Sequence, residues 1–269
     1  DESESRGLGD VYKRQKMYRV FYLPVIVFFL SSCSSDTDKD QSLLSSLIAP
    51  NFSYKQDYFN CNLNKGNSLI NIESFFSKIV DKYSEKKLED LSLFLLFPDK
   101  DEIINSFTIS IISQKNYESV LTLIEILKNQ GIEDLASCSF AIHQKNGIKL
   151  INYSESNNDL FLQEILRCRF NEGYNYGTFK LSIDRFSNQI QSLKVPYSLS
   201  YVESKDNFDF LWINSFHEEN YIETLSTRWI VLNDSDEIKD EFIANATCVD
   251  SSLYKACLLY TSPSPRDSD

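Results

Sequence analysis

The sequence contains none of the compact motifs that identify a catalytic or nucleotide-binding site. It has no Gly-rich phosphate loop (G-x-G-x-x-G or G-x-x-x-x-G-K-[ST]), no H-E-x-x-H, no EF-hand loop and no Ser-His-Asp arrangement. Histidine is scarce, with two residues in a chain of 269. These absences leave no residue that we predict to be catalytic and no cofactor that we predict to be bound. They favour a non-enzymatic role without fixing a function.

An excess of basic charge is absent as well. The chain carries 27 Lys and Arg against 39 Asp and Glu, a formal net charge of -12. Binding to a nucleic-acid backbone depends on neutralising phosphates with basic side chains. We therefore exclude nucleic acid as a partner, and interpret the acidic surface as a source of solubility.

The apolar run near the N-terminus is too short to cross a bilayer as a helix, because it covers only the 11 residues 20–30. Arg19 precedes it and Leu30-Ser31-Ser32-Cys33 follows. Residues 17–32 thus resemble a bacterial lipoprotein signal peptide, in which Cys33 is lipidated and becomes the mature N-terminus. A plain membrane anchor is the alternative.

This resemblance implies a protein of the bacterial cell envelope. Ser34 after the lipidated cysteine favours the outer membrane, facing the periplasm or the cell surface. Residues 33–55 are polar at first and lack a sustained period, so we expect a tether. The expected partners are the lipid anchor and a ligand or another envelope protein.

Both ends of the chain resemble translated sequencing adapter. Residues 5–15 read SRGLGDVYKRQ and residues 257–267 read CLLYTSPSPRD. Neither has an apolar period that would place it on a core, so we assign residues 1–16 and 257–269 to foreign tails and leave them out of the fold. Real disordered tails are the alternative.

A repeat organises the chain between these ends. Cys61-Asn62-Leu63-Asn64-Lys65-Gly66 matches the segment that starts 107 positions later (168 minus 61), which has the same form, C-x-x-N-[KE]-G, and runs from Cys168 to Gly173. Two further matches follow in the same order, Asn-Tyr at 116 and 220 and a cysteine at 138 and 248. We therefore predict two copies of one domain, with a left-handed backbone at the glycine of each turn.

The cysteines support this division. With Cys33 assigned to lipid and Cys257 to the C-terminal tail, four cysteines remain, and export makes disulfides their expected state. The repeat selects the pairs Cys61–Cys138 and Cys168–Cys248 out of three connectivities, since each copy then has an equivalent bridge. No close C-x-x-C spacing indicates a metal, although a zinc site was the alternative.

Hydrophobic periodicity gives each copy the order βαββαβ. Strands are expected at residues 58–63, 91–97, 107–111 and 138–143 in the first copy, and at 164–170, 197–202, 208–216 and 244–249 in the second. Helices lie between them, and Asn116 and Asn220 are the expected N-caps of the second helix in each copy.

The predicted fold is α+β, with two tandem ferredoxin-like repeats at residues 56–146 and 161–256. In such a sheet the first and last strands are neighbours, as the proposed disulfides require. Two such units resemble the dimeric α+β barrels, in which two four-stranded sheets face each other. The chain also resembles lipoprotein-type sequences of marine bacteria that carry Cys-x-x-Asn-x-Gly and a later Trp and Cys, a likeness that spans residues 58–256 and implies no function.

Trp212 and His217 are the two candidates for ligand binding. If the sheets enclose a cavity, Trp212 with Phe208 and Phe210 would line it, and His217 would lie between a strand and a helix. Some α+β barrels are cofactor-independent monooxygenases that use Trp, Asn and His beside an aromatic substrate, and this resemblance implies a small-molecule enzyme as the alternative function. A core tryptophan and a surface histidine are the simpler interpretations, and His143 is expected at the surface.

Overall fold

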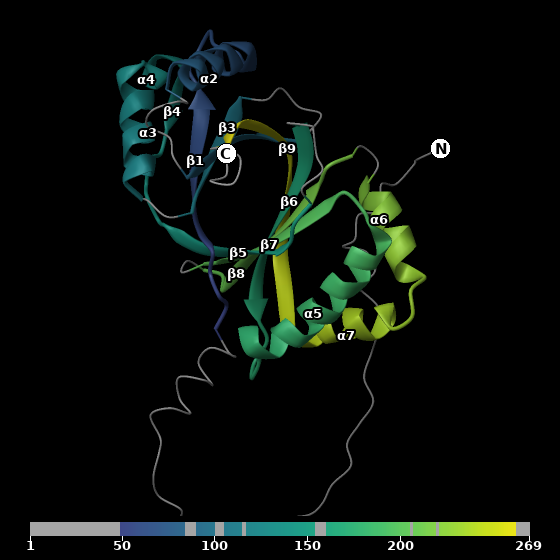
Figure 1. Cartoon of the computed structure of the whole chain (residues 1–269). Coiled ribbons are helices and arrows are strands. Elements are labelled where there is room, and N and C mark those ends of the chain that lie inside the picture. The colour runs from purple at the N-terminus through teal and green to yellow at the C-terminus, as the bar shows by residue number, and fades with distance from the viewer. Residues whose placement is uncertain are drawn as a thin grey trace, which may run out of the picture.

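The strands of the protein close into a single barrel with helices on two sides (Figure 1). The structure is a computed structural model that describes residues 49–83, 90–99, 105–114, 117–153, 160–204, 207–218 and 221–261. The predicted signal peptide, Cys33, Asn116 and Asn220 lie outside these ranges. No helix within them is both long and apolar enough to cross a membrane.

The chain alternates strands and helices in the order expected for its first half. The elements are β1 (Tyr54–Leu63), α2 (Leu69–Tyr83), β2 (Leu91–Pro98), β3 (Ser106–Ser113), α3 (Tyr117–Asn129), the one-turn α4 (Ile132–Leu135), β4 (Ala136–Cys138) and β5 (Lys145–Ile151). Gly131 follows α3 with φ 91°, a left-handed conformation that ends the helix. The last strand was predicted at 138–143, which is wrong, because β4 ends at Cys138 and β5 starts only at Lys145.

The second half follows with β6 (Leu160–Phe170), α5 (Tyr176–Leu193), β7 (Tyr197–Glu203), β8 (Phe210–Phe216), α6 (Tyr221–Ile230), α7 (Ser235–Asn245) and β9 (Ala246–Thr261). Asn175 begins α5 with a capping box, since its side chain accepts from the amides of Gly177 and Thr178. The sequence pattern missed α4 and α7, and it placed the start of the last strand two residues early.

Eight strands form the closed ring, in the order β3-β2-β9-β6-β8-β7-β5-β1, and β1 pairs with β3 to complete it. All of these pairings are antiparallel. β4 adds to β1 beside β5 and carries Cys138 opposite Cys61. The chain is therefore an α+β barrel, as the resemblance to barrels of this class implied.

Two kinds of hydrophobic core stabilise the barrel. One lies inside it and joins both halves; it is formed by Tyr54, Leu96, Ile165, Val202, Leu211, Ile213 and Ala256. The others lie outside, where α2, α3 and α4 cover the strands of the first half and α5, α6 and α7 cover those of the second. Both faces of the sheet are consequently covered, one by the opposite wall and the other by helices.

The C-x-x-N-[KE]-G segments tie each first strand to the end of its half. Cys61 bonds to Cys138 and Cys168 to Cys248, which confirms the predicted disulfides. Asn64 Nδ2 donates to the carbonyl of Glu133, and Asn171 Nδ2 donates to the carbonyls that end α7.

The glycines that close these segments, Gly66 and Gly173, have φ of 91° and 81°, as predicted for the turn. The shared residues of the repeat are thus explained by structure.

The C-terminal part of β9 contradicts one expectation. Residues 257–261 continue the strand and pair with β2, and Cys257, Leu259 and Tyr260 pack against the core of the first half. Our prediction that this stretch would stay off the core is wrong, because its consecutive apolar residues, Cys257 to Tyr260, suit a strand that is covered on both faces. Likewise, the predicted tether ends earlier than residue 55, since β1 begins at Tyr54. The adapter origin of the stretch stays a prediction.

Candidate functional site

Polar side chains are unusually frequent inside the barrel. Successive residues of a strand point to opposite faces. A residue two positions away from an inner-core residue on the same strand therefore also points into the barrel. These positions hold Gln56 and Tyr58 on β1, Ser110 on β3, Gln163 on β6 and Ser215 on β8. A packed barrel needs only apolar residues there, and this polar set therefore marks the interior as a candidate site.

Two glutamines face this interior, and in each the amide nitrogen forms a hydrogen bond while the carbonyl oxygen forms none within the described residues. Gln56 Nε2 donates to Ser110 Oγ at 3.0 Å, and Gln163 Nε2 donates to Ser215 Oγ at 3.3 Å. Both carbonyl oxygens are buried, and neither has a hydrogen-bond partner among the described residues. A buried polar atom left unpaired costs free energy, so each oxygen favours a partner that enters from outside the chain.

The tyrosines beside the glutamines stay neutral. The Tyr58 hydroxyl is buried and also lacks a partner within the described chain. Burial raises the pKa of Tyr58 well above its ordinary value, with a smaller opposite effect from Arg167. Burial likewise raises the pKa of Tyr54 to about 12, although a hydrogen bond with Ser200 opposes the shift.

His217 closes one end of the interior, which we call the mouth. Its ring lies between those of Tyr153 and Phe161, with centroid distances of 5.4 and 5.0 Å. Nε2 is 3.1 Å from Ser198 Oγ, and Nδ1 is buried with no partner in the described residues. Burial lowers the pKa of His217, and the ammonium of Lys149 lowers it further. Hence the imidazole is neutral near pH 7, with one nitrogen oriented by a serine and the other available.

We expect the stability of the protein to fall on acidification through this histidine. Its folded pKa lies below the unfolded value of about 6.5, so the unfolded chain binds more protons as the pH falls past that value. Urea unfolding at about pH 7.5 and about pH 5.5 should show a smaller loss of stability in His217→Gln than in the parent. Glu164, whose pKa is raised by burial, acts in the opposite sense but is present in both proteins. Equal losses in the two proteins would contradict the assignment.

Trp212 lies on the other face of β8 and does not reach the interior. Its ring contacts Phe179 of α5 and Phe242 of α7, at 5.5 and 5.8 Å. Phe210 has the same orientation and stacks on Tyr201 at 5.0 Å. The expectation that these rings would line a cavity between the sheets is therefore wrong, and the structure does not bring Trp212 together with His217.

The helix-covered face carries a polar chain of its own. The Tyr197 hydroxyl donates to Asn214 Oδ1 at 2.7 Å, and Asn214 Nδ2 donates to Glu164 Oε2 at 2.8 Å. Burial raises the pKa of Glu164, and the hydrogen bond from Asn214 opposes this shift. Because the members of the chain bind one another, this chain is a weaker candidate than the unpaired atoms of the interior. His143 is exposed, as expected, and its amide donates to the buried Asp57.

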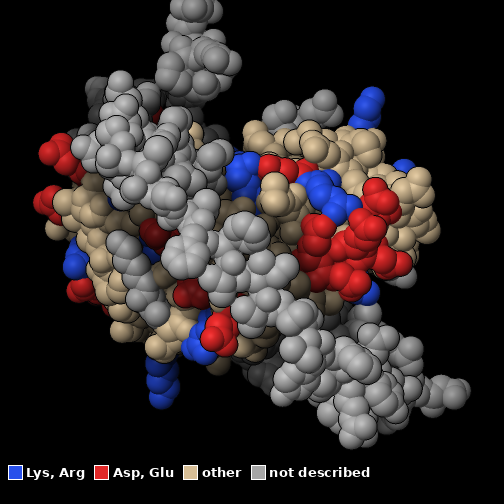
Figure 2. All heavy atoms as spheres, turned by 90° about the horizontal axis from the view of Figure 1, so that it is seen from below, with Lys and Arg blue, Asp and Glu red and all other residues tan. Residues whose placement is uncertain are grey.

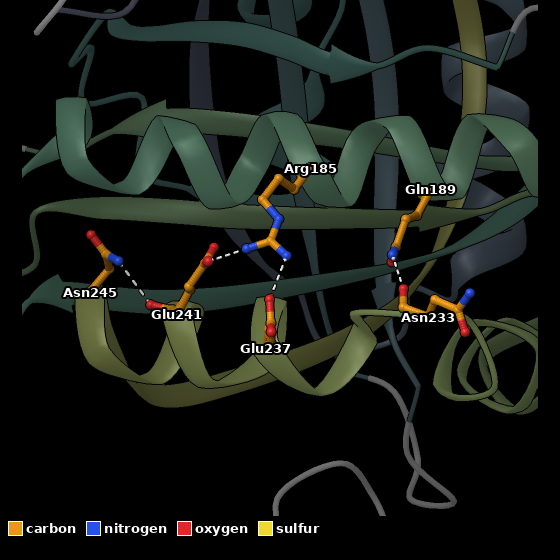
Figure 3. A network of polar contacts seen from close by, with 6 residues as sticks. All are labelled: Arg185, Gln189, Asn233, Glu237, Glu241 and Asn245. Carbon is orange, nitrogen blue, oxygen red and sulfur yellow. Dashed lines mark hydrogen bonds and ion pairs between the residues drawn. The ribbon is translucent and has the colours of Figure 1, made fainter.

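The outer surface offers ion pairs instead of a metal site. Arg185 of α5 reaches Glu237 and Glu241 of α7, and Gln189 Nε2 donates to the carbonyl of Asn233 (Figure 3). Acidic side chains gather on one part of the face seen in Figure 2. Glu237, Asp240, Glu241 and Ala244 of α7 line a shallow hollow. No cluster that could hold a metal occurs within the described residues.

The interior glutamines were missed at the level of sequence, although a signal exists. Gln56 and Gln163 are separated by the same 107 positions as Cys61 and Cys168. The next residue is acidic in both segments. Extending the repeat five residues before each cysteine finds this pair without any structure.

Known structures share the fold at low sequence identity. A candidate monooxygenase from Fusobacterium nucleatum subsp. nucleatum superposes with a TM-score of 0.53 and 11% identity, covering 78% of this chain and 94% of that one. A chlorite dismutase mutant from Candidatus Nitrospira defluvii gives 0.49 and 9%, covering 79% and 94%, and a candidate monooxygenase from Lactobacillus acidophilus gives 0.47 and 8%, covering 77% and 95%. No protein-family model matches the chain, and no curated protein matches it. The first likeness supports the α+β barrel fold, which is all that identities this low show.

Proposed function

We propose that the protein is a small-molecule enzyme of the α+β barrel class, with the barrel interior as its substrate site and His217 as its proton acceptor. The observation that carries the proposal is the state of this imidazole. Nε2 lies 3.1 Å from Ser198 Oγ, which accepts from the amide of Tyr153, and the buried Nδ1 has no partner among the described residues. In the tautomer that carries its proton on Nε2, Nε2 donates to Ser198 Oγ and the lone pair of Nδ1 is unused. A neutral imidazole with one oriented nitrogen is suited to general-base catalysis near pH 7.

The surroundings of His217 favour an aromatic substrate. The rings of Tyr153 and Phe161 flank the imidazole, so a substrate ring that displaces one of them would stack beside the base. Lys149, which is exposed at the mouth, would stabilise the anion that forms when the substrate loses a proton. The site thus provides a base, an aromatic surface and a cation.

The likeness to the Fusobacterium protein suggests the class of reaction. We propose that His217 removes a proton from an activated aromatic methylene, and that the carbanion then adds to dioxygen. The histidinium returns its proton to the resulting peroxide, which loses water, so that R₂CH₂ and O₂ give R₂C=O and H₂O. The electrons come from the substrate, and the proposal requires no cofactor.

Oxygen uptake with anthrone, an aromatic compound with an activated methylene, tests this proposal. His217→Gln is expected to lower kcat by about a hundredfold or more, the usual contribution of a positioned base. His143→Gln is the matched control, because it removes the other histidine from an exposed site and should leave the rate unchanged. Equal rates in the two variants, or no uptake by the parent, would contradict the proposal.

We also propose that the two halves arose by duplication. The ladders support this: Cys61 pairs with Phe107 and with Cys138, while Cys168 pairs with Phe210 and with Cys248. The turn hydrogen bonds of Asn64 and Asn171 recur at the same places.

The two disulfides are consistent with our further proposal that the protein is exported and anchored through Cys33. Globomycin sensitivity of processing, and its absence in Cys33→Ala, would test this proposal.

A further inference from the structure

Gln56 and Gln163 occupy equivalent places on opposite walls of the barrel. In the closed ring of eight, β1 and β6 are separated by three strands in either direction. Every neighbour is antiparallel, so two strands four steps apart run in the same direction. Each glutamine is five residues before the cysteine of its strand. The two amides therefore point inward at corresponding registers, from walls that face each other.

The atoms of the pair that have no partner among the described residues are both hydrogen-bond acceptors. Gln56 is only 3% exposed, and its Nε2, like that of Gln163, is already bound to a serine. The two Oε1 atoms accept no hydrogen bond within the described chain. A molecule that satisfies both must carry a donor at each of two ends.

The interior around the pair is neutral and aromatic. The rings of Phe94 and Phe161 meet edge to face at 6.0 Å, and Tyr58 and Tyr254 pack against the same core. The guanidinium of Arg167 is paired with Asp250 at 2.7 Å, which leaves no unpaired charge facing the glutamines from β6. A charged ligand would lose its hydration here without compensation, whereas a neutral ring would bury apolar surface.

We infer that the interior of the barrel binds a neutral aromatic diol, whose hydroxyl groups donate to Gln56 Oε1 and Gln163 Oε1 from opposite sides. This inference rests on the proposed function and deepens it: the substrate would carry two hydroxyl groups in addition to the activated methylene, and hydroquinone and anthrone each probe one of these two features. It adds that recognition lies with the glutamine pair, while proton transfer lies with His217 at the mouth.

Calorimetric titration with hydroquinone under anaerobic conditions tests the inference, because no turnover can occur without dioxygen. Toluene, which lacks donors, and benzoate, which is charged, should bind at least tenfold more weakly. Gln56→Leu and Gln163→Leu should each weaken hydroquinone binding by about tenfold, the effect of one lost hydrogen bond that leaves a donor unpaired. His143→Gln, which replaces an exposed histidine outside the interior, should bind hydroquinone as the parent does.

Thermal unfolding without ligand distinguishes a binding role from a structural one. Each leucine variant loses an unpaired buried oxygen, so a Tm equal to or above that of the parent is expected. A lower Tm with unchanged affinity would assign the glutamines to the fold and overturn the inference. Absence of hydroquinone binding would also overturn the inference, and the two oxygens would then be assigned to buried water. Anthrone turnover in the same preparation would show that the proposed function stands even so.

Discussion

Replacing Cys168 and Cys248 together with alanine is expected to lower the free energy of unfolding by about 4 kcal/mol. The disulfide closes a loop with a sequence separation of 80 residues, and in the loop-entropy model its loss returns that freedom to the unfolded chain. Cys168 is fully buried among aromatic side chains, so the variant also loses packing. Since a domain of this kind is stable by only about 5 to 15 kcal/mol, this single change removes a large part of the total.

The measurement is urea unfolding of the parent and the double variant, followed by far-ultraviolet circular dichroism. The pair Cys61→Ala and Cys138→Ala provides a matched comparison, because its separation of 77 residues predicts nearly the same loss. Cys257→Ala controls for the loss of a thiol outside both bridges. A change below about 1 kcal/mol in either double variant would show that the unfolded chain keeps the ends of the loop together without the bond.

The framework of the barrel could be predicted from sequence because it depends on local and strongly periodic signals. The matching C-x-x-N-[KE]-G segments determine both disulfides and both turns, and Gly66 and Gly173 adopt the left-handed conformation that the motif requires. Long amphipathic helices such as α5 also follow from their period.

The orientation of Trp212 could not be predicted, for a physical reason. Period-two alternation separates the two faces of a strand, but it identifies the buried face only where the other face is in water. In β8 both sets are buried or half-buried, with Leu211 and Ile213 inside the barrel and Phe210 and Trp212 under the helices. Only the closure of the ring, which depends on contacts between the halves, decides which set lines the interior.

Gly147→Ala is expected to destabilise the protein by about 3 kcal/mol, near the upper end of the usual cost of overpacking. Gly147 pairs with Tyr54 of β1 and with Val202 of β7, at the seam where the two halves join. A Cβ atom there would lie 2.2 Å from Cε2 and 2.3 Å from Cζ of the Tyr54 ring. These separations are far below van der Waals contact, so the ring or the strand must move.

The Tyr54 ring cannot move cheaply, and this argues that the cost of the methyl group is large. The side chain is only 5% exposed, packs in the inner core, and is bound through its hydroxyl to Ser200. A double-mutant cycle with Tyr54→Ala measures the contact directly: Gly147→Ala should cost little once the ring is gone, which gives a coupling energy of about 2 to 3 kcal/mol. Additive effects would mean that Gly147 is needed for its backbone alone. A strong coupling would instead show that glycine is needed at the seam because the ring of the opposite strand occupies the space of its side chain, and that closure of the barrel depends on this contact between halves.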